Sequence, residues 1–355
     1  MKLRGAQSNI AGRFEAFARE PFDDGWAREE TPPDPATEVR EERARSILAT
    51  NDSPDVPFER SINPYRGCEH GCIYCFARPS HAYLELSPGL DFETRLFAKT
   101  NAVALLREAL ARPGYEVKPI AFGTNTDCYQ PIERRYRLMR GILELLAECR
   151  HPLTIVTKSA LVERDLDLLA PMARENLVRV FVSIATLDAP LARRLEPRAA
   201  SPGRRLDVLR ALARAGVPCG VMVAPVIPAL TDRSLEAVLE AAAEAGATMA
   251  GWIMLRLPHE VRPLFKQWLA QHYAERAAHV MSLVRDVRGG RENDPRFGSR
   301  MTGEGHFARL IAQRFALACR RLGLAGGNAR DDSRGALDCS RFRPPGASAQ
   351  LSLFR

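Results

Sequence analysis

The stretch that decides the fold is Asn63-Pro-Tyr-Arg-Gly-Cys68-Glu-His-Gly-Cys72-Ile-Tyr-Cys75-Phe76, which places three cysteines within eight residues. Thiolates packed this closely repel one another, and their spacing is typical of ligands to one soft metal centre. Gly67 and Gly71 allow the backbone to wrap closely around such a centre. The stretch therefore predicts a metal site with Cys68, Cys72 and Cys75 as its ligands.

Three kinds of site are compatible with closely spaced thiols. A structural zinc ion needs four ligands, so a zinc site would have to borrow His70 or His81. A disulfide would leave one of the three cysteines unpaired. An iron–sulfur cluster of the [4Fe-4S] type, held by three cysteines, keeps one iron open to an outside ligand. We favour the cluster, and zinc or a chance grouping of thiols remain the alternatives.

The composition indicates a globular protein without a membrane span. The chain has 355 residues, 46% of them hydrophobic, which is enough for one large core. It contains no run of 18 apolar residues, and the first residues lack the apolar segment of a signal peptide. Eight cysteines without a pairing pattern suggest a reducing compartment, so we expect a cytoplasmic protein.

The net charge of +8 is unevenly distributed along the chain. Residues 1–60 carry 9 basic and 13 acidic groups, whereas residues 256–355 carry 18 basic and 9 acidic groups. A basic excess of this kind suits a polyanionic partner such as nucleic acid. An arginine-rich composition without any such role is the alternative.

Apolar strands alternate with amphipathic helices between residues 61 and 256. This order predicts an α/β fold, a parallel sheet covered by helices. Strands are expected at 61–64, 118–123, 153–157, 178–184, 217–224 and 249–255, and helices at 101–111, 131–149, 163–175, 203–215 and 234–245. Single helices are expected at 38–48, 263–285 and 304–322.

Polar residues follow several of these strands. Gly123, Thr124, Asn125, Thr126 and Asp127 follow the second strand, Thr157-Lys158-Ser159 follow the third, and Ser183 and Glu196-Pro197-Arg198 follow the fourth. Ligands of parallel α/β folds bind beyond the carboxyl ends of the strands, so we expect a binding site there. Lys158 in particular needs an anionic partner, because it emerges from a buried strand.

The C-x3-C-x2-C motif, with Tyr74 before its last cysteine, resembles that of the radical S-adenosylmethionine (SAM) enzymes. The resemblance implies a partial (β/α)6 barrel over residues 61–256. It also implies that the open iron of the cluster binds SAM, which one electron from a reducing donor cleaves to a 5′-deoxyadenosyl radical. By the same resemblance Tyr74 lies against the adenine, Lys158 and Ser183 contact SAM, and residues 123–127 lie beside its amino-acid part. Arg198 would bind the carboxylate of SAM or a phosphate of the substrate.

Further motifs resemble those of one subgroup, the spore photoproduct lyase-like or DNA repair photolyase proteins. They are Thr126-Asp127, Tyr129-Gln130-Pro131, Thr157-Lys158-Ser159, Leu195-Glu196-Pro197-Arg198 and the strand end at 221–228. This resemblance implies a lyase-like enzyme that acts on damaged DNA and returns a hydrogen atom from a thiol. Cys128 is the nearest candidate for that thiol, although the thiol is expected nearer Gly123 or Thr124. A buried structural role for Cys128 is the alternative.

The last residues, Gln350-Leu351-Ser352-Leu353-Phe354-Arg355, resemble the pentapeptide that binds the bacterial sliding clamp. In that motif the glutamine sets the register, and the leucine and phenylalanine fill a pocket. A tail that folds back onto its own domain is the alternative reading.

Four regions follow from these patterns: an N-terminal arm over 1–60, the radical SAM partial barrel over 61–256, a helical basic extension over 257–324 and a tail over 325–355. The favoured function is a cytoplasmic radical SAM enzyme for DNA repair. Radical modification of RNA or of a peptide, and a metal-binding module without catalytic activity that is recruited to the clamp, are the alternatives.

Overall fold

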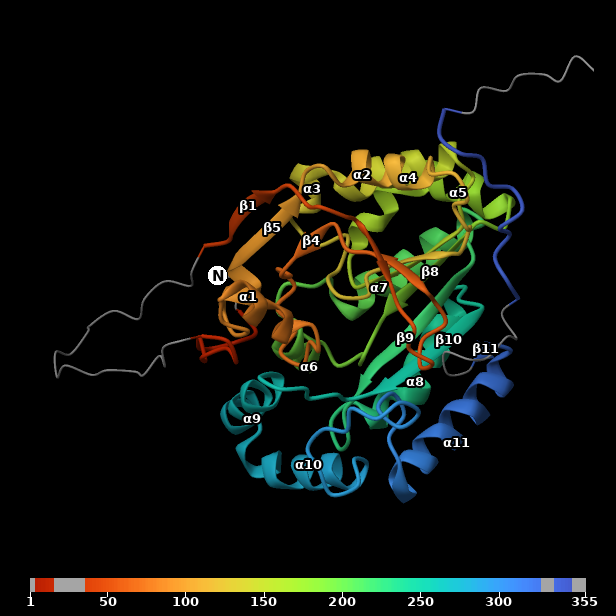
Figure 1. Cartoon of the computed structure of the whole chain (residues 1–355). Coiled ribbons are helices and arrows are strands. Elements are labelled where there is room, and N and C mark those ends of the chain that lie inside the picture. Colours follow the sequence, from red (N-terminus) through yellow and green to blue (C-terminus); the bar gives the residue numbers. More distant parts are fainter. Residues whose placement is uncertain (1–3, 16–35, 327–334, 347–355) are drawn as a thin grey trace, which may run out of the picture.

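A sheet of six parallel strands forms the centre of the computed structural model, which describes residues 4–15, 36–326 and 335–346 (Figure 1). In spatial order the six strands are β3 (Arg60–Ile62), β6 (Ile120–Phe122), β7 (Leu153–Thr157), β8 (Val178–Ser183), β9 (Cys219–Val226) and β10 (Met249–Met254). Two short strands extend the sheet: β2 (Leu48–Thr50) lies antiparallel to β3, and β11 (Ala325–Gly326) lies parallel to β10. The predicted partial barrel is confirmed.

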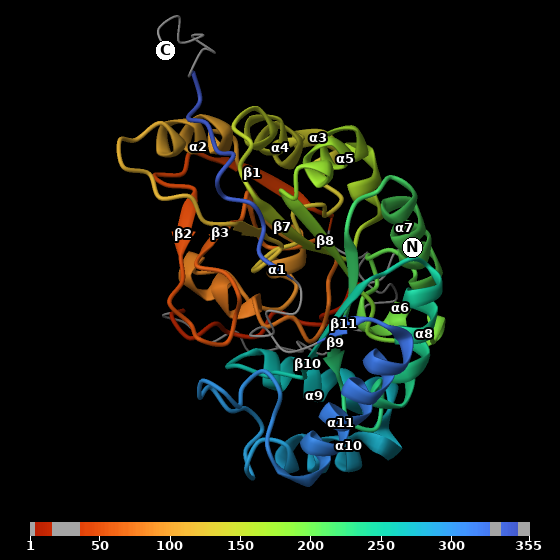
Figure 2. The same cartoon turned by 90° about the vertical axis from the view of Figure 1, so that its right-hand side faces the viewer.

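An arc of helices covers the outer side of this sheet (Figure 2). Its members are α2 (Ala102–Leu110), α4 (Leu138–Glu148), α5 (Leu166–Arg174), α7 (Pro202–Arg214), α8 (Leu235–Glu244) and α11 (Gly305–Leu322). In α4 the buried leucine, isoleucine and methionine side chains recur every three or four residues, which gives the helix one apolar face. These faces and the buried strands form the main hydrophobic core.

A second hydrophobic core lies beside the cysteine loop. It joins α6 (Ala189–Leu195), α9 (Val261–His272) and α10 (Ala274–Asp286) to Ile73 and Tyr74. The indole nitrogen of Trp268 on α9 donates to the carbonyl of Arg194, which fixes α9 against α6. The C-terminal helices thus support the loop that carries the cysteines.

A small sheet borders the cysteine loop on its other side. It consists of β1 (Glu38–Glu42), β5 (Arg95–Lys99) and β4 (Tyr65–Arg66), with β1 parallel and β4 antiparallel to β5. The 3-10 helix η1 (Arg78–Leu84) and α1 (Asp91–Thr94) lead into it. The single helix predicted over 38–48 is wrong, because residues 38–42 pair with a strand more than fifty positions away and local propensity carries no signal of that pairing.

Two other predicted helices are each interrupted. In the first, Arg137 adopts a left-handed conformation (φ 51°) and separates α3 (Glu133–Tyr136) from α4. The Glu133 carboxylate then accepts hydrogen bonds from the amides of Met139 and Arg140, so it caps the start of α4. In the second, Tyr273 leaves the helical conformation between α9 and α10. Two shorter 3-10 helices, η2 (Ala160–Asp165) and η3 (Asp232–Ser234), precede α5 and α8.

The two ends of the described chain pack on opposite parts of the molecule. Near the N-terminus, the amides of Gly5 and Ala6 donate to the Glu93 carboxylate on α1, beside the cysteine loop. Near the C-terminus, residues 335–346 run past the amino ends of the central strands. There the amide of Asp338 donates to the carbonyl of Asn176, and Phe342 packs against His151.

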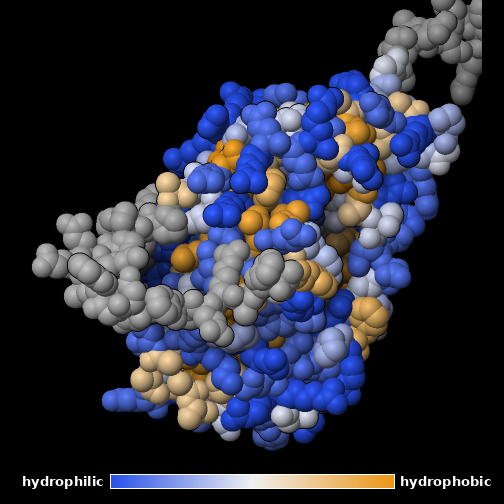
Figure 3. Space-filling view, turned by 60° about the vertical axis from the view of Figure 1, so that its left-hand side comes forward, coloured by the Kyte–Doolittle hydropathy of each residue, from blue (hydrophilic) through white to orange (hydrophobic). Residues whose placement is uncertain are grey.

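The surface seen in Figure 3 is mostly hydrophilic, with small separate hydrophobic areas. Among the residues that the structure describes, no helix combines the length and the apolar character that a membrane span requires.

Candidate metal centre and cofactor site

The three cysteines lie on a tightly folded loop between β4 and η1, beyond the carboxyl end of β3. Gly67 and Gly71 both have positive φ, 71° and 67°. A Cβ atom at Gly67 would lie 2.7 Å from Leu96 Cδ2, and one at Gly71 would lie 2.6 Å from Glu93 Oε2. The predicted need for glycine at both positions is therefore confirmed, because any side chain would push the loop off its support.

A buried ion pair holds the backbone of this loop. The Arg78 guanidinium and the Glu93 carboxylate pair with both side chains fully buried. Arg78 also donates to the carbonyls of Cys72 and Gly71, at 2.9 and 3.2 Å. Neither residue was predicted, since the pairing of two charges fifteen positions apart leaves no pattern in the sequence. Together they fix the segment around Cys72.

The three thiols are free, and they lie close enough to repel one another as thiolates. Burial raises the pKa of the Cys72 thiol to about 12. Burial, followed by the negative charges of Asp127 and of the other two cysteines, raises the pKa of Cys68. Bound iron would favour the deprotonated thiols, as metals do at thiolate sites. The loop therefore fits a soft cationic centre.

Three thiols on one loop are compatible with an iron–sulfur cluster. Within the described residues, no group of three or more His, Cys, Asp or Glu side chains could hold one metal ion. In a [4Fe-4S] cluster each cysteine binds a different iron, so the thiols need not converge on one point. Of the histidines that a zinc site would borrow, His70 contacts Asp127 and His81 hydrogen-bonds the carbonyl of Arg95.

The turn after β6 is built around Gly123 and Asn63. Gly123 has φ 77°, and a Cβ atom there would lie 1.9 Å from the Val156 carbonyl oxygen. The Asn63 side chain accepts hydrogen bonds from the amides of Asn125 and Thr126 and donates to Thr124 Oγ1. The turn therefore lies directly against the segment that leads from β3 into the cysteine loop.

Asp127 connects this turn to the neighbouring strand and to the cysteine loop. Its Oδ1 accepts from Thr157 Oγ1 at 2.8 Å, and its Oδ2 accepts from the Lys158 amide at 2.7 Å. His70 Nδ1 lies 3.4 Å from the same Oδ2. Burial by itself would raise the pKa of Asp127, but His70 and the amides of Lys158 and Tyr129 outweigh it and lower the pKa to about 2. Both carboxylate oxygens are thus already engaged by protein donors.

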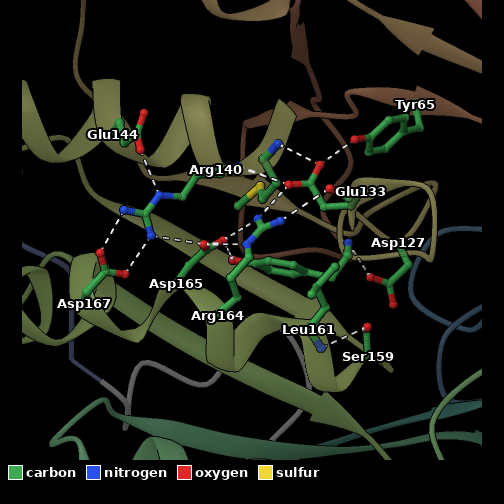
Figure 4. A network of polar contacts seen from close by, with 12 residues as sticks. Tyr65, Asp127, Glu133, Arg140, Glu144, Ser159, Leu161, Arg164, Asp165 and Asp167 are labelled. Carbon is green, nitrogen blue, oxygen red and sulfur yellow. Dashed lines mark hydrogen bonds and ion pairs between the residues drawn. The ribbon is translucent and has the colours of Figure 1, made fainter. Parts of the chain in front are cut away.

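Figure 4 shows the polar network behind this turn. The buried Glu133 carboxylate accepts from Tyr65 Oη and from Arg164, which also pairs with Asp165. Asp165 in turn accepts from Tyr129 Oη at 3.0 Å. Tyr65 precedes the cysteine loop and Tyr129 follows Asp127, so the network anchors both segments of the site from outside the barrel.

Tyr74 and Lys158 meet on the inner side of the site. Tyr74 Oη donates to the Glu196 carboxylate, which forms a buried ion pair with Arg205. The Lys158 ammonium lies 6.0 Å from the centre of the Tyr74 ring. Burial would lower the pKa of Lys158, but Cys72 and Glu196 outweigh it and raise the pKa. The structure thus brings two of the predicted cofactor residues together, and it adds Glu196 and Arg205 as the groups that orient Tyr74.

Arg198 and Ser183 already have partners within the protein. Arg198 pairs with Glu69 on the cysteine loop, and its amide donates to the carbonyl of His70. Ser183 Oγ donates to the carbonyl of Ala224 at the end of the next strand. The cofactor contacts expected of these two residues stay predictions. Gln130 belongs to a motif of the resemblance for which no role was expected. Its side chain accepts a hydrogen bond from the Glu69 amide and donates one to the carbonyl of Gly67, so it also holds the cysteine loop.

Cys128 lies in the main hydrophobic core with no exposed area. Burial, followed by the charges of Asp127 and Glu133, raises the pKa of its thiol well above the usual range. A hydrogen-atom donor has to reach the substrate, and this location agrees instead with the structural alternative for Cys128. The role of hydrogen donor stays a prediction. The predicted clamp motif, Gln350–Phe354, lies outside the described residues.

The sequence matches the family model described as Radical SAM superfamily over residues 62–242. The chain is 45% identical over 232 residues to an uncharacterised protein of Mycobacterium tuberculosis (strain H37Rv), covering 65% of this chain and 68% of that protein. It is 30% identical over 171 residues to an uncharacterised protein of Methanocaldococcus jannaschii, covering 48% and 61% of the two chains.

Solved structures of spore photoproduct lyase share the fold. The complex of that enzyme with dinucleoside spore photoproduct has a TM-score of 0.60 at 18% identity and covers 81% of each chain. A variant with bound AdoMet and dinucleoside spore photoproduct has a TM-score of 0.61 at 17% identity and covers 81% of this chain and 80% of its own. At this level of identity the likeness concerns the architecture alone.

Proposed function

Because the chain belongs to the radical SAM superfamily, whose enzymes use a [4Fe-4S] cluster and SAM, we propose that Cys68, Cys72 and Cys75 hold the cluster and that the substrate is damaged DNA. The observation that carries the first part is the glycine-containing loop with three free, buried or half-buried thiols, held at the edge of a six-stranded parallel sheet. When bound, the cluster and SAM supply a 5′-deoxyadenosyl radical after one-electron reduction.

The side chains around the loop bind and orient the cofactor. The Glu196 carboxylate, itself paired with Arg205, accepts from the Tyr74 hydroxyl, so that the Tyr74 ring is fixed where the adenine is expected. Lys158 provides a cation near Cys72, which suits the carboxylate of SAM. The turn over 123–127 offers short polar side chains to the amino-acid part of SAM. Because Asp127 is fully engaged, we assign it the positioning of the turn and of Lys158.

Two features support damaged DNA as the substrate class. The fold is that of spore photoproduct lyase, whose structures contain a dinucleoside photoproduct. The basic excess of the chain lies in residues 256–355, which suits contacts to phosphates.

The test is an anaerobic assay of the reconstituted protein. After addition of iron, sulfide, dithionite and SAM, we expect 5′-deoxyadenosine from the native protein and none from a variant with Cys68→Ala, Cys72→Ala and Cys75→Ala. Cys219→Ala, which changes a buried thiol on β9, is the matched control and should keep the activity. Irradiated DNA added to the same assay should be altered only by the active proteins. Absence of iron binding would overturn the cluster assignment, and product formation without any change in DNA would overturn the substrate.

We further propose that Gln350, Leu351, Ser352, Leu353 and Phe354 recruit the enzyme to the bacterial sliding clamp. The support is the match of these residues to the clamp-binding pentapeptide. A chain that ends at Ala349 should lose binding to the clamp in a pull-down and should still cleave SAM. Undiminished binding by the shortened chain would refute this part of the proposal.

All eight cysteines of the chain are free, which supports a reducing compartment, and we therefore place the enzyme in the cytoplasm with a low-potential electron donor. Fractionation of cells followed by immunodetection tests this location. Recovery of the protein outside the cytoplasmic fraction would contradict it.

A further inference from the structure

A cavity of about 380 Å³ lies at the carboxyl end of β10, where the loop before α11 approaches the strand. Three arginines, Arg256, Arg262 and Arg300, line it together with His259 and Asn293. Arg256 follows β10 by two residues, so this cavity lies at the edge of the sheet where ligands of parallel α/β folds bind. Nothing in the cofactor site described above uses these side chains.

The arginines of this region carry more positive charge than nearby carboxylates neutralise. Among the described residues no carboxylate contacts Arg256: its Nε has no hydrogen-bond partner, and its Nη1 meets only Met301 Sδ, at 3.7 Å. Burial, followed by the charge of Arg300, lowers the pKa of Arg256. The side chain is only partly buried, but its buried Nε lacks a partner, so a bound anion would stabilise it.

Arg300 has one acidic partner, and a further arginine fixes its position. Its Nε donates to Asp55 Oδ2 at 2.5 Å. Behind it the fully buried Arg288 donates to the carbonyls of Ser299, Arg300 and Leu255, and it thereby ties the loop that carries Arg300 to the end of β10. Arg262 differs from the other two lining arginines, because it is half exposed and lies 3.7 Å from Glu292.

Each of the two inner arginines lies over an exposed aromatic ring. The Arg256 guanidinium is 5.3 Å from the ring centre of Phe76, and that of Arg300 is 4.5 Å from the ring centre of Phe297. Phe76 is 46% exposed and Phe297 is 59% exposed, which is unusual for large apolar side chains. Phe76 directly follows Cys75, so this aromatic–arginine pair links the cavity to the cysteine loop. Aromatic rings next to cationic side chains are the common platform for unstacked bases.

We propose that Arg256 and Arg300 form a binding pocket for one internucleotide phosphate of the substrate strand, with Phe76 and Phe297 as stacking surfaces for the adjoining bases. The proposal rests on the assignment of a nucleic-acid substrate and specifies where that substrate is held. The pocket selects a phosphodiester next to unpaired bases, because a guanidinium pair suits phosphate oxygens and the exposed rings suit bases that have left a duplex. The pocket thus places a lesion in front of the cysteine loop.

The test measures binding of a fluorescein-labelled oligothymidylate to the cofactor-loaded protein by anisotropy at several salt concentrations. Arg256→Gln should weaken binding about five- to ten-fold and should reduce the slope of log K against log salt by about 0.7, the value for one phosphate of a single strand. Arg309→Gln, an exposed arginine on α11 with the same change of charge, is the matched control and should bind nearly as the native protein does. Equal losses of affinity in Arg256→Gln and Arg309→Gln would overturn the assignment of phosphate binding to this pocket.

Substitution of Phe76 or Phe297 should affect binding differently from substitution of Arg256. Phe76→Leu and Phe297→Leu should each weaken binding about five-fold without a change in salt slope, since stacking involves no counterion release. If Arg256→Gln folds poorly, Arg256→Lys keeps the charge and should retain the slope while it loses affinity. Unchanged affinity in Arg256→Lys and both phenylalanine variants would overturn the proposal.

Competition by inorganic phosphate and by a thymidine dinucleotide distinguishes the sources of the anion. We expect millimolar inorganic phosphate to compete weakly and a thymidine dinucleotide to compete more strongly, with both effects dependent on Arg256. Arg256-dependent binding of inorganic phosphate alone would assign the pocket to a free anion and overturn the proposal. A native protein that forms 5′-deoxyadenosine but binds no oligonucleotide would refute the DNA substrate itself, whereas intact oligonucleotide binding in every variant would refute only the pocket.

Discussion

His70 Nδ1 lies 3.4 Å from Asp127 Oδ2, so a residue between Cys68 and Cys72 is held by a carboxylate that follows a central strand. The same carboxylate accepts hydrogen bonds from Thr157 and from the backbone of Lys158. The position of the cysteine loop is therefore coupled to the two strand ends that are expected to bind SAM.

Asp127→Asn should loosen this connection. The amide has the size of the carboxylate but lacks its charge, and one of its two polar atoms can only donate. At least one of the four donors, Thr157 Oγ1, His70 Nδ1 and the amides of Tyr129 and Lys158, therefore loses its acceptor. We expect the free energy of unfolding to fall by about 1–3 kcal/mol and iron retention to decrease. Urea unfolding of the metal-free protein and iron analysis measure the two effects. Asp167→Asn, an exposed carboxylate paired with Arg140, should change stability by less than about 1 kcal/mol.

Arg78→Met should destabilise the loop more strongly. The substitution leaves the Glu93 carboxylate buried without its cation, which typically costs about 3–5 kcal/mol. Because Glu93 also holds the amides of Gly5 and Ala6, limited proteolysis should cut the N-terminal segment faster in this variant. The exposed pair of Arg107 and Glu148 supplies the control, and Arg107→Met should cost about 1 kcal/mol or less. Similar losses from both variants would contradict the role of the buried pair.

Gly123→Ala should be poorly tolerated. The new Cβ would lie 1.9 Å from the Val156 carbonyl oxygen, and φ is positive, so both the turn and β7 must shift. We expect a loss of more than about 2 kcal/mol in unfolding free energy and a weaker affinity for SAM. Gly203→Ala on α7 is the matched control: no atom lies within 4 Å of its Cβ, and alanine favours a helix. A neutral effect at Gly123 would show that the turn has room to move.

Stability should fall in mild acid because of His151. Tyr115 Oη is 2.9 Å from its Nε2, and the carbonyl of Pro152 is 2.9 Å from its Nδ1. Burial lowers the pKa of His151 to about 4, from 6.5. The unfolded chain then binds a proton that the folded chain does not, so the contribution is fully present above pH 6.5 and is lost as the pH falls towards 4. Between pH 7 and pH 5 we expect His151 alone to contribute a loss of about 2 kcal/mol.

His151→Asn isolates this effect. Unfolding of the native protein and of the variant by urea at pH 7 and at pH 5 should show a smaller drop in the variant. Burial also lowers the pKa of His81 to about 4. His81 should therefore preserve part of the decrease in unfolding free energy in the variant. The same drop in both proteins would exclude His151 as its source.

Cys128→Ala tests the buried thiol. The small cavity should cost about 1 kcal/mol, while 5′-deoxyadenosine formation should persist because the thiol does not reach the site. Unchanged repair of irradiated DNA would also exclude Cys128 as the hydrogen donor. Loss of repair, with 5′-deoxyadenosine formation and stability unchanged, would instead identify Cys128 as the hydrogen donor.

The barrel could be predicted because its signals are local. Strands such as Val178–Ser183 are short apolar runs, and helices such as α7 have a serine and a proline at the start and Gly216 after the end. The pairing of β1 with β5 could not be predicted, because it depends on contacts between distant segments. The interruption at Arg137 was missed as well, because arginine carries no local signal for a left-handed turn.

The spacing of the three cysteines suggested their role as ligands, whereas no sequence pattern indicated the residues that support their loop. Glu93, Arg78 and Arg205 are charged residues that a sequence pattern places on the surface, and only mutual pairing makes their burial acceptable. For Cys128 the sequence and the structure suggest different roles. Its position directly after the turn over 123–127 suggested a catalytic role, but its side chain lies in the main hydrophobic core.

The path of residues 335–346 has a consequence for how the enzyme would be tethered. This segment crosses the amino ends of the strands, whereas the cysteine loop lies beyond the carboxyl end of β3. A partner that bound this segment would contact the amino ends of the strands and leave their carboxyl ends exposed. Capture by a carrier and access to a lesion would then use opposite sides of the molecule and would not compete for the same surface.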